Sequence, residues 1–267
     1  GTKLSQERSE LLIEIRGLKK AFDGVQVLDG LDLDIHEGEV ITIIGSSGSG
    51  KSVLLKMIIG LIAPDEGSIK FDGIELTELT EREWVPIRRR IGMLFQEGAL
   101  FDSMTVYENV AYGLVEQGKT SEAEMRRRVA EALTAVSLPG IEERQPKQLS
   151  GGMQKRVALA RAVAMEPQVV IYDEPTEGLD PINVTRVDRL ILSLRDRLGI
   201  TSIIVTHNMR STFRISDRVA FIHEGKVAIV GPPDEVQAWD DPSIEHFVAR
   251  AKMKLPSEKS IPPPPAD

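Results

Sequence analysis

The segment GSSGSGKS, from Gly45 to Ser52, restricts the fold of this chain more than any other stretch. It matches the pattern G-x-x-x-x-G-K-S/T and directly follows the β-branched run VITII at residues 40–44. Such a run is typical of a strand buried on both faces, and the apolar residues after Ser52 are typical of a helix. A strand, a glycine-rich turn and a helix in this order predict a phosphate-binding loop.

The predicted loop has the chemistry that a nucleotide phosphate needs. Backbone N–H groups of a glycine-rich turn can face one anion, and the N-terminus of the following helix adds partial positive charge. Lys51 would reach the terminal phosphates, and the Ser52 hydroxyl would ligate Mg²⁺. A plain loop of small residues would not need this Lys-Ser pair between a strand and a helix. We therefore expect a nucleotide site lined by Gly45, Ser46, Ser47, Gly48, Ser49, Gly50, Lys51 and Ser52.

Composition narrows the classes of function. The 267 residues suffice for one large domain or two modest ones, and 33 Lys and Arg against 41 Asp and Glu give a formal net charge of −8. This acidic balance argues against sequence-independent nucleic-acid binding. Without cysteine the chain has no disulfide, thiolate metal site or Cys nucleophile. Because it also lacks a signal-like start and any apolar run near the roughly 18 residues of a membrane span, we expect a soluble cytosolic protein.

Short strands and amphipathic helices alternate along the chain. Residues 11–40 alternate between apolar and polar side chains, which predicts short strands in a sheet with one face in water. The runs QVVIYDEP and TSIIVTHN predict two core strands, and RVAFIHEGKVAIVG predicts a hairpin that turns at Glu224 and Gly225. Strands that alternate with helices predict a mostly parallel, helix-covered sheet with a small antiparallel region at the start.

Three helices are expected in the middle and second half of the chain. The segment SEAEMRRRVAEALTAV begins with Ser121 and Glu124 in capping-box spacing, and a second helix should begin near Ser150. A third has Asp180 as its N-cap, Pro181 in its first turn and Gly199 past its end. Its predicted buried stripe consists of Val187, Leu190, Ile191, Leu194 and Leu198.

These patterns predict a single nucleotide-binding domain over residues 10–249, with a helical subdomain inserted at about 97–165. Residues 250–267 include a run of four prolines and have little apolar surface to bury. We expect this tail to be extended or disordered.

Two further groups of residues suggest chemistry. Asp173 stands at the end of a predicted strand, where a carboxylate can hold Mg²⁺, and Glu174 could orient and deprotonate an attacking water. Adjacent acids after a strand can also be solvated turn residues, but the phosphate loop upstream favours catalysis. At the start of a helix, Ser150, Gly151 and Gly152 offer a second place to hold an anion, although an isolated S-G-G is also an ordinary helix cap. One nucleotide does not need two such places, so the second could serve the nucleotide of a partner copy.

Together these residues resemble the ABC-transporter ATPase family up to about Ala249. The loop GSSGSGKS resembles its Walker A motif, LSGGM its signature, VVIYDE its Walker B motif and GLDP, which contains Asp180, its D-loop. Gln96 matches the Q-loop and His207 the switch histidine, while Phe22 falls where the family has an aromatic side chain that stacks on adenine. A core Phe would look the same in sequence. The implied fold is a P-loop NTPase (RecA-like), mostly parallel α/β core with an N-terminal antiparallel β subdomain and an inserted α-helical subdomain.

The resemblance implies that the cofactors are ATP and Mg²⁺. Two copies would face head to tail, and each ATP would lie between the Walker A loop of one copy and the signature of the other. Glu174, His207 and Gln96 would be catalytic, with the metal held by Ser52, Gln96 and Asp173. Met153 stands where most members have Gln, so the amide contact of that side chain is lost here, whereas the serine and the glycine amides remain.

A finer resemblance concerns the transported substrate. The segment GALFDSMTVYENVA at 98–111, together with LSGGMQKR, is similar to the Mla-type ATPases that drive phospholipid transport with MCE-domain proteins. This implies a second copy, an integral-membrane permease, an MCE-domain substrate-binding protein and a small accessory cytosolic subunit as partners, at the cytoplasmic side of the inner membrane. Two alternatives stay open: the ATPase of an importer for a polar solute such as an amino acid, and a soluble ABC ATPase that acts on ribosomes or DNA.

Overall fold

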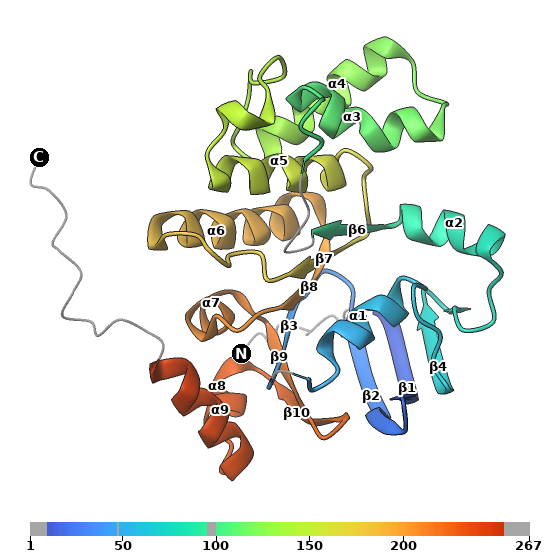
Figure 1. The fold of residues 1–267 in the computed structure, drawn as a ribbon, viewed down its shortest axis with the longest axis vertical. Helices are drawn as coiled ribbons and strands as arrows, with labels where there is room; N and C mark the ends of the chain where they lie inside the picture. The colour runs from blue at the N-terminus through green and yellow to red at the C-terminus, as the bar shows by residue number, and fades with distance from the viewer. Residues whose placement is uncertain (1–9, 47, 95–99, 254–267) are drawn as a thin grey trace, which may run out of the picture.

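The computed structural model describes residues 10–46, 48–94 and 100–253 (Figure 1). Within these ranges, no helix combines the length and the apolar character that crossing a bilayer requires. Gln96, Ser47 and the residues after Met253 lie outside the described part of the chain.

A six-stranded sheet in the order β10-β9-β3-β8-β7-β6 forms the centre of the molecule. Strands β3, β6, β7, β8 and β9 run parallel, while β10 pairs antiparallel with β9. Because parallel strands end at one edge, the residues that follow β3, β7 and β8 are brought together there. The bounds are β3 Val40–Gly45, β6 Ile91–Leu94, β7 Val169–Asp173, β8 Thr201–Val205, β9 Arg218–His223 and β10 Lys226–Gly231. The predicted mostly parallel sheet is confirmed.

A second, antiparallel sheet has the order β2-β1-β4-β5. Its strands are β1 Leu11–Phe22, β2 Val25–His36, β4 Glu66–Phe71 and β5 Ile74–Glu75. The first two are 12 residues each, so the expectation of several short strands here is wrong. The physical reason is a set of register shifts, one of them between Ile15 and Leu18, which let a single strand continue where the apolar alternation breaks. Ile13, Ile15 and Leu18 consequently all reach the core.

Several of the helices begin at a polar residue that caps them through its side chain. The side chains of Thr105, Ser121, Ser150 and Asp180 each accept a backbone N–H in the first turn of a helix. Helix α9 ends at Met253, so residues 250–253, which were predicted to belong to an extended tail, are helical. The bounds are α1 Lys51–Ile58, α2 Glu81–Arg89, α3 Val106–Gln117, α4 Glu122–Ala135, η1 Pro146–Gln148, α5 Gly151–Val163, α6 Pro181–Leu198, α7 Met209–Ile215, α8 Pro233–Gln237 and α9 Pro242–Met253.

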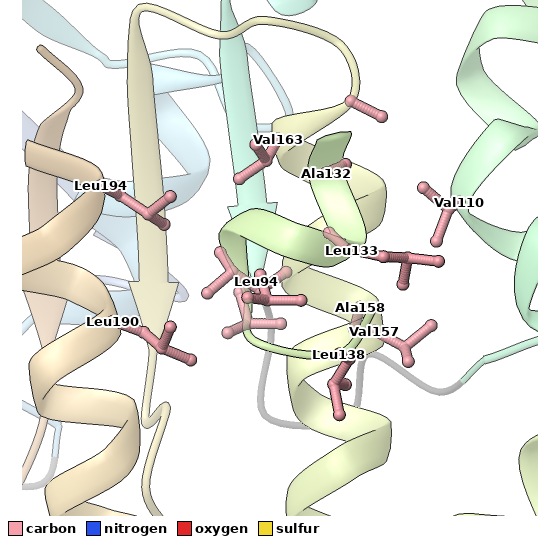
Figure 2. Close-up of a cluster of buried hydrophobic side chains, with 14 of the residues drawn as sticks. Leu94, Val110, Ala132, Leu133, Leu138, Val157, Ala158, Val163, Leu190 and Leu194 are labelled. Carbon is pink, nitrogen blue, oxygen red and sulfur yellow. The ribbon is translucent and has the colours of Figure 1, made fainter. Parts of the chain in front are cut away.

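Helices α3, α4 and α5 pack together and against α6 through one apolar cluster (Figure 2). Val110, Leu133 and Val157 supply it from the three inserted helices, and Leu190 and Leu194 supply it from α6. Leu198 does not join the predicted stripe, since its side chain is 55% exposed. The end of α6 and its C-cap, residues 196–199, are all exposed. The apolar period therefore continues in the sequence beyond the surface that packs against the inserted helices.

Leu133→Ala should lower the free energy of unfolding by about 2–5 kcal/mol, because it opens a cavity in this cluster. Leu198→Ala is the matched control and should change it by less than about 0.5 kcal/mol, since that side chain lies at the surface. Urea unfolding followed by circular dichroism measures both. Equal effects of the two substitutions would contradict this account of the cluster.

Candidate functional site

The glycine-rich loop joins the buried strand β3 to helix α1 and fits tightly between two other strands. A Cβ on Gly45 would lie 2.7 Å from the carbonyl oxygen of Ile222 in β9. A Cβ on Gly50 would lie 2.7 Å from Leu28 in β2, and Gly50 has a left-handed φ of 99° that disfavours any side chain. Glycine is therefore required at both ends of the loop, for close approach at the first and for backbone conformation at the second.

Lys51 begins α1 and points back into the loop. Its side chain is buried, and Nζ donates hydrogen bonds to the carbonyl oxygens of Gly45 and, at 3.2 Å, Ser46. Burial lowers the pKa of Lys51, while the charges of Glu174 and Asp173 partly oppose that shift. None of the described residues caps α1 through a side chain, so the N–H groups of its first turn remain available to an anion.

The two acids of VVIYDE take different positions. Asp173 is the last residue of β7, and burial, together with Glu177, raises its pKa against the opposing charges of Lys51 and Lys56. Glu174 lies one residue past the strand, with a φ of 49° in the left-handed region. Its backbone N–H donates to the carbonyl oxygen of Val205 at 2.8 Å, which ties it to the end of β8.

The carboxylate of Glu174 is held by the segment that follows β8. Oε2 accepts hydrogen bonds from the Thr206 hydroxyl at 3.1 Å and from the His207 backbone N–H at 3.3 Å. Nδ1 of His207 lies 3.1 Å from Oε1 of the same carboxylate, and the imidazole is half exposed. Thr206 is a contact that the sequence reasoning missed, although its place directly before His207 at a strand end was a usable signal.

These elements line one open cavity of about 460 Å³. It brings together five residues predicted from the sequence, namely Lys51, Ser52, Asp173, Glu174 and His207; its other described lining residues are Thr176, Glu177, Val205 and Asn208. Phe22, Asp180 and the signature residues are not among the described residues that line it.

The oxygen donors of this cavity suit Mg²⁺. Ser52 and Asp173 supply a hydroxyl and a carboxylate, which are the hard ligands that this ion prefers. Among the described residues no group of three or more His, Asp and Glu side chains could hold a metal by itself. Mg²⁺ can bind through one or two protein oxygens, with phosphates and waters completing its shell.

The signature turn lies against the D-loop of the same chain. Ser150 is the N-cap of α5, and its hydroxyl accepts the Met153 N–H at 3.2 Å. A Cβ on Gly152 would lie 2.9 Å from Oδ1 of Asn183, whose backbone N–H is in turn bound by Asp180 at 2.9 Å. Met153 packs against the apolar cluster of the inserted helices.

Phe22 ends strand β1 at the tip of the β1-β2 hairpin. Its side chain is 40% exposed, and Nζ of Lys20 lies 5.4 Å from the ring centroid. An exposed ring can stack on a planar base, and the role predicted for Phe22 stays a prediction.

Comparison with known proteins decides the family. The sequence model of the ABC transporter family matches residues 28–177, which is more than half of the chain. The chain belongs to the ABC transporter family. It is an ABC ATPase, and the predicted P-loop fold is confirmed.

Three relatives with different names and from different organisms are similar to this ABC ATPase over most of its length. It is 40% identical to the probable ribonucleotide transport ATP-binding protein mkl of Mycobacterium leprae, over 88% of this chain and 68% of that protein. It is 43% identical to the sulfate/thiosulfate import ATP-binding protein CysA of Xylella fastidiosa, over 91% and 70%. It is 41% identical to protein TRIGALACTOSYLDIACYLGLYCEROL 3, chloroplastic, of Arabidopsis thaliana, over 90% and 74%. The chain thus spans roughly 70% of the length of these relatives, and it spans 66% of mkl from Mycobacterium tuberculosis.

A solved structure shares the fold over most of the chain. It is the dimeric, post-hydrolysis state of the ATP-binding cassette MJ0796 with ADP and Pi, which is 33% identical with a TM-score of 0.74. The match covers 83% of this chain and 99% of that one.

Lys51→Ala should weaken ATP binding at least about tenfold, equivalent to about 1.4 kcal/mol, because the buried cation at the phosphate loop is lost. Lys70→Ala, on an exposed position of β4, is the matched control and should leave affinity unchanged. Titration with a fluorescent ATP analogue measures both. An unaltered dissociation constant in the Lys51 variant would refute this role of the lysine.

Proposed function

We propose that this chain hydrolyses ATP as one of two nucleotide-binding subunits of a transporter that moves phospholipid. The observation that supports hydrolysis is the convergence of Lys51, Asp173, Glu174 and His207 on one cavity. A phosphate site that served binding alone would not need a carboxylate and an imidazole held against each other at 3.1 Å.

The residues of the cavity divide the chemistry among them. Lys51 and the N–H groups of the loop and of α1 bind the phosphates, and Lys51 offsets the negative charge that develops on them. Glu174 orients the attacking water and accepts its proton, while His207 binds the terminal phosphate and helps to place that water. Mg²⁺ held by Ser52 and Asp173 would neutralise phosphate charge. Gln96 would complete this set, and it lies outside the described residues.

A second copy would complete the site. The signature residues do not line the cavity of their own chain, so within one copy they have no nucleotide to bind. Gly151 is exposed, and a Cβ placed on it would meet nothing within 4 Å. The Gly151 N–H therefore remains open to an anion from outside, and the Ser150 hydroxyl, which accepts the Met153 N–H, can still donate its own proton. The dimeric ADP-bound cassette MJ0796 supports the same arrangement here.

Glu174→Gln should retain ATP binding and lower hydrolysis by about 10²–10⁴-fold, because the amide cannot accept the proton of the water. Glu66→Gln is the matched control, since its side chain is 69% exposed on the antiparallel sheet. Phosphate release and ATP affinity are measured on the same preparations. Near-normal turnover in the Glu174 variant would remove this residue from the mechanism.

The permease would dock next to the Q-loop. The exposed rings of Phe101 and Tyr112 lie 4.8 Å apart between centroids, with the Arg161 guanidinium 5.7 Å from the Phe101 ring. Val115, which is 58% exposed on α3, extends this apolar surface. A surface of this kind suits the insertion of a helix from a membrane subunit.

Two observations favour a lipid as the transported substrate, and the first of them points to phospholipid. The segment at 98–111 is similar to Mla-type ATPases, and the Arabidopsis relative is named after a galactolipid. An MCE-domain protein and a small accessory subunit would then join the permease on the inner membrane, with this chain at its cytoplasmic side. The competing proposal is import of a polar solute, because the CysA relative is named for sulfate and thiosulfate import.

Purification of the native complex from membranes should separate the two proposals. We expect an integral permease and an MCE-domain protein to co-purify, with phospholipid extractable from the complex and detected by mass spectrometry. Co-purification of a periplasmic solute-binding protein instead would contradict lipid transport. It would leave ATP hydrolysis by this chain intact.

A further inference from the structure

A buried carboxylate lies in the middle of helix α6, outside the ATP cavity. Asp188 is 1% exposed, and its Oδ2 accepts a hydrogen bond from the Ser211 hydroxyl at 2.9 Å. Nη1 of Arg214 lies 3.5 Å from the same oxygen, and Oδ1 has no hydrogen-bond partner among the described residues. Burial raises the pKa of Asp188, which Ser211 and Arg214 partly oppose. A buried charge with incomplete pairing destabilises a fold, so stability does not account for an acid at this position.

A continuous series of hydrogen bonds leads from this carboxylate to Glu174. Ser211 donates its backbone N–H to Oδ1 of Asn208, the N-cap of α7, at 3.0 Å. Asn208 in turn donates its own N–H to the Thr206 hydroxyl at 3.0 Å. That hydroxyl donates to Oε2 of Glu174 at 3.1 Å. The first turn of α7 is thus fixed at one end by Asp188 and holds Glu174 at the other.

The surroundings of Asp188 leave no room for a ligand. The cavity that it lines, next to Thr42, Thr176 and Thr206, measures about 10 Å³. That is the space of at most one water molecule. Helices α6 and α7 lie side by side at this point (Figure 1), and α6 begins at the D-loop residue Asp180.

We propose that Asp188 is a positioning residue for ATP hydrolysis. By anchoring Ser211, it sets the first turn of α7, and through Asn208 and Thr206 it sets the direction of the Glu174 carboxylate. Because the anchor is on α6, displacement of the D-loop at that helix's N-terminus reaches Glu174 by the same contacts. The proposal rests on the proposed role of Glu174 as the base.

The test removes the anchor without leaving a buried polar group. In the double variant Asp188→Val with Ser211→Ala, two contacting polar side chains become apolar, which is often neutral or stabilising. Arg214 is 38% exposed and also bonds the Thr185 hydroxyl, so it can turn to water. We expect the thermal midpoint to hold or rise and the KM for ATP to change by less than twofold. We expect kcat to fall about three- to tenfold.

Four further variants complete the design. Asp188→Asn keeps an acceptor for Ser211 and should retain more than half of kcat. Asp196→Asn lies on the exposed side of the same helix, with 63% side-chain exposure, and should be silent. Ser211→Ala alone removes the hydrogen bond to Asp188 with a smaller change, and it should lower kcat. It is the test to use if the double variant does not fold. When Thr206→Val is added to the double variant, the two losses of kcat should be strongly non-additive. Both changes break the same series of hydrogen bonds between Asp188 and Glu174.

Unchanged kcat in the folded double variant, or in Ser211→Ala, would overturn the proposal. So would a loss of kcat that is accompanied by a parallel fall in thermal midpoint and in ATP affinity, since that describes general damage. Additive losses with Thr206→Val would also overturn it. Glu174→Gln, assayed alongside, separates the two levels: if it retains turnover the proposed base is wrong, whereas if it loses turnover and the double variant does not, only the role of Asp188 fails.

Discussion

The site depends on the fit of one glycine-rich loop between three strands. The loop leaves β3 at Gly45, which lies against the backbone of β9, and it reaches α1 at Gly50, which lies against β2. These contacts come from different sheets, so the loop can form only when the antiparallel sheet has packed on the parallel one. The position of Lys51 is a consequence, because the lysine is the first residue after the turn. A small change in the packing of the two sheets would therefore move the backbone of the loop, and with it the phosphate site, without any substitution in the site itself.

Glu174, the proposed base, is held in a backbone conformation that is unfavourable for a residue other than glycine. A non-glycine residue with a left-handed φ costs on the order of 1–3 kcal/mol. Glu174 keeps this φ of 49° because its N–H binds Val205 and its carboxylate is bound by Thr206 and His207. The turn directs the side chain out of the line of β7 and into the cavity. Every one of these contacts comes from β8 or the residues after it, so the pairing of β7 with β8 positions the acid.

The sequence predicted the local features of this protein better than its long-range contacts. Asp180, Pro181 and Gly199 set the ends of α6 as expected, because capping depends only on neighbours in the chain. Leu198 followed the apolar period of the same helix yet is exposed, since periodicity does not reveal where the packing partner ends. The five predicted residues of the cavity were found because each belongs to a short motif. Thr206 and Asp188 make contacts 32 and 23 residues away in sequence, to Glu174 and Ser211. The place of Thr206 beside His207 indicated that it lies near the site, but no local pattern identified the partner of either residue.

Glycine is needed at the two signature positions, 151 and 152, for different physical reasons. Gly151 faces open space, so a small residue there keeps the N-terminus of α5 accessible to an anion. Gly152 is buried against Asn183, and any side chain would push the signature away from the D-loop. Lys155 adds a second connection, since its Nζ donates to the carbonyl oxygen of Glu177 at 2.7 Å, just after the Walker B acids. Helix α5 therefore contacts the chain after Glu174 at two points, at Glu177 in the loop and at Asn183 in the first turn of α6. The proposed anion site at the signature and the proposed base Glu174 would serve different nucleotides of a dimer, and helix α5 connects them within one chain.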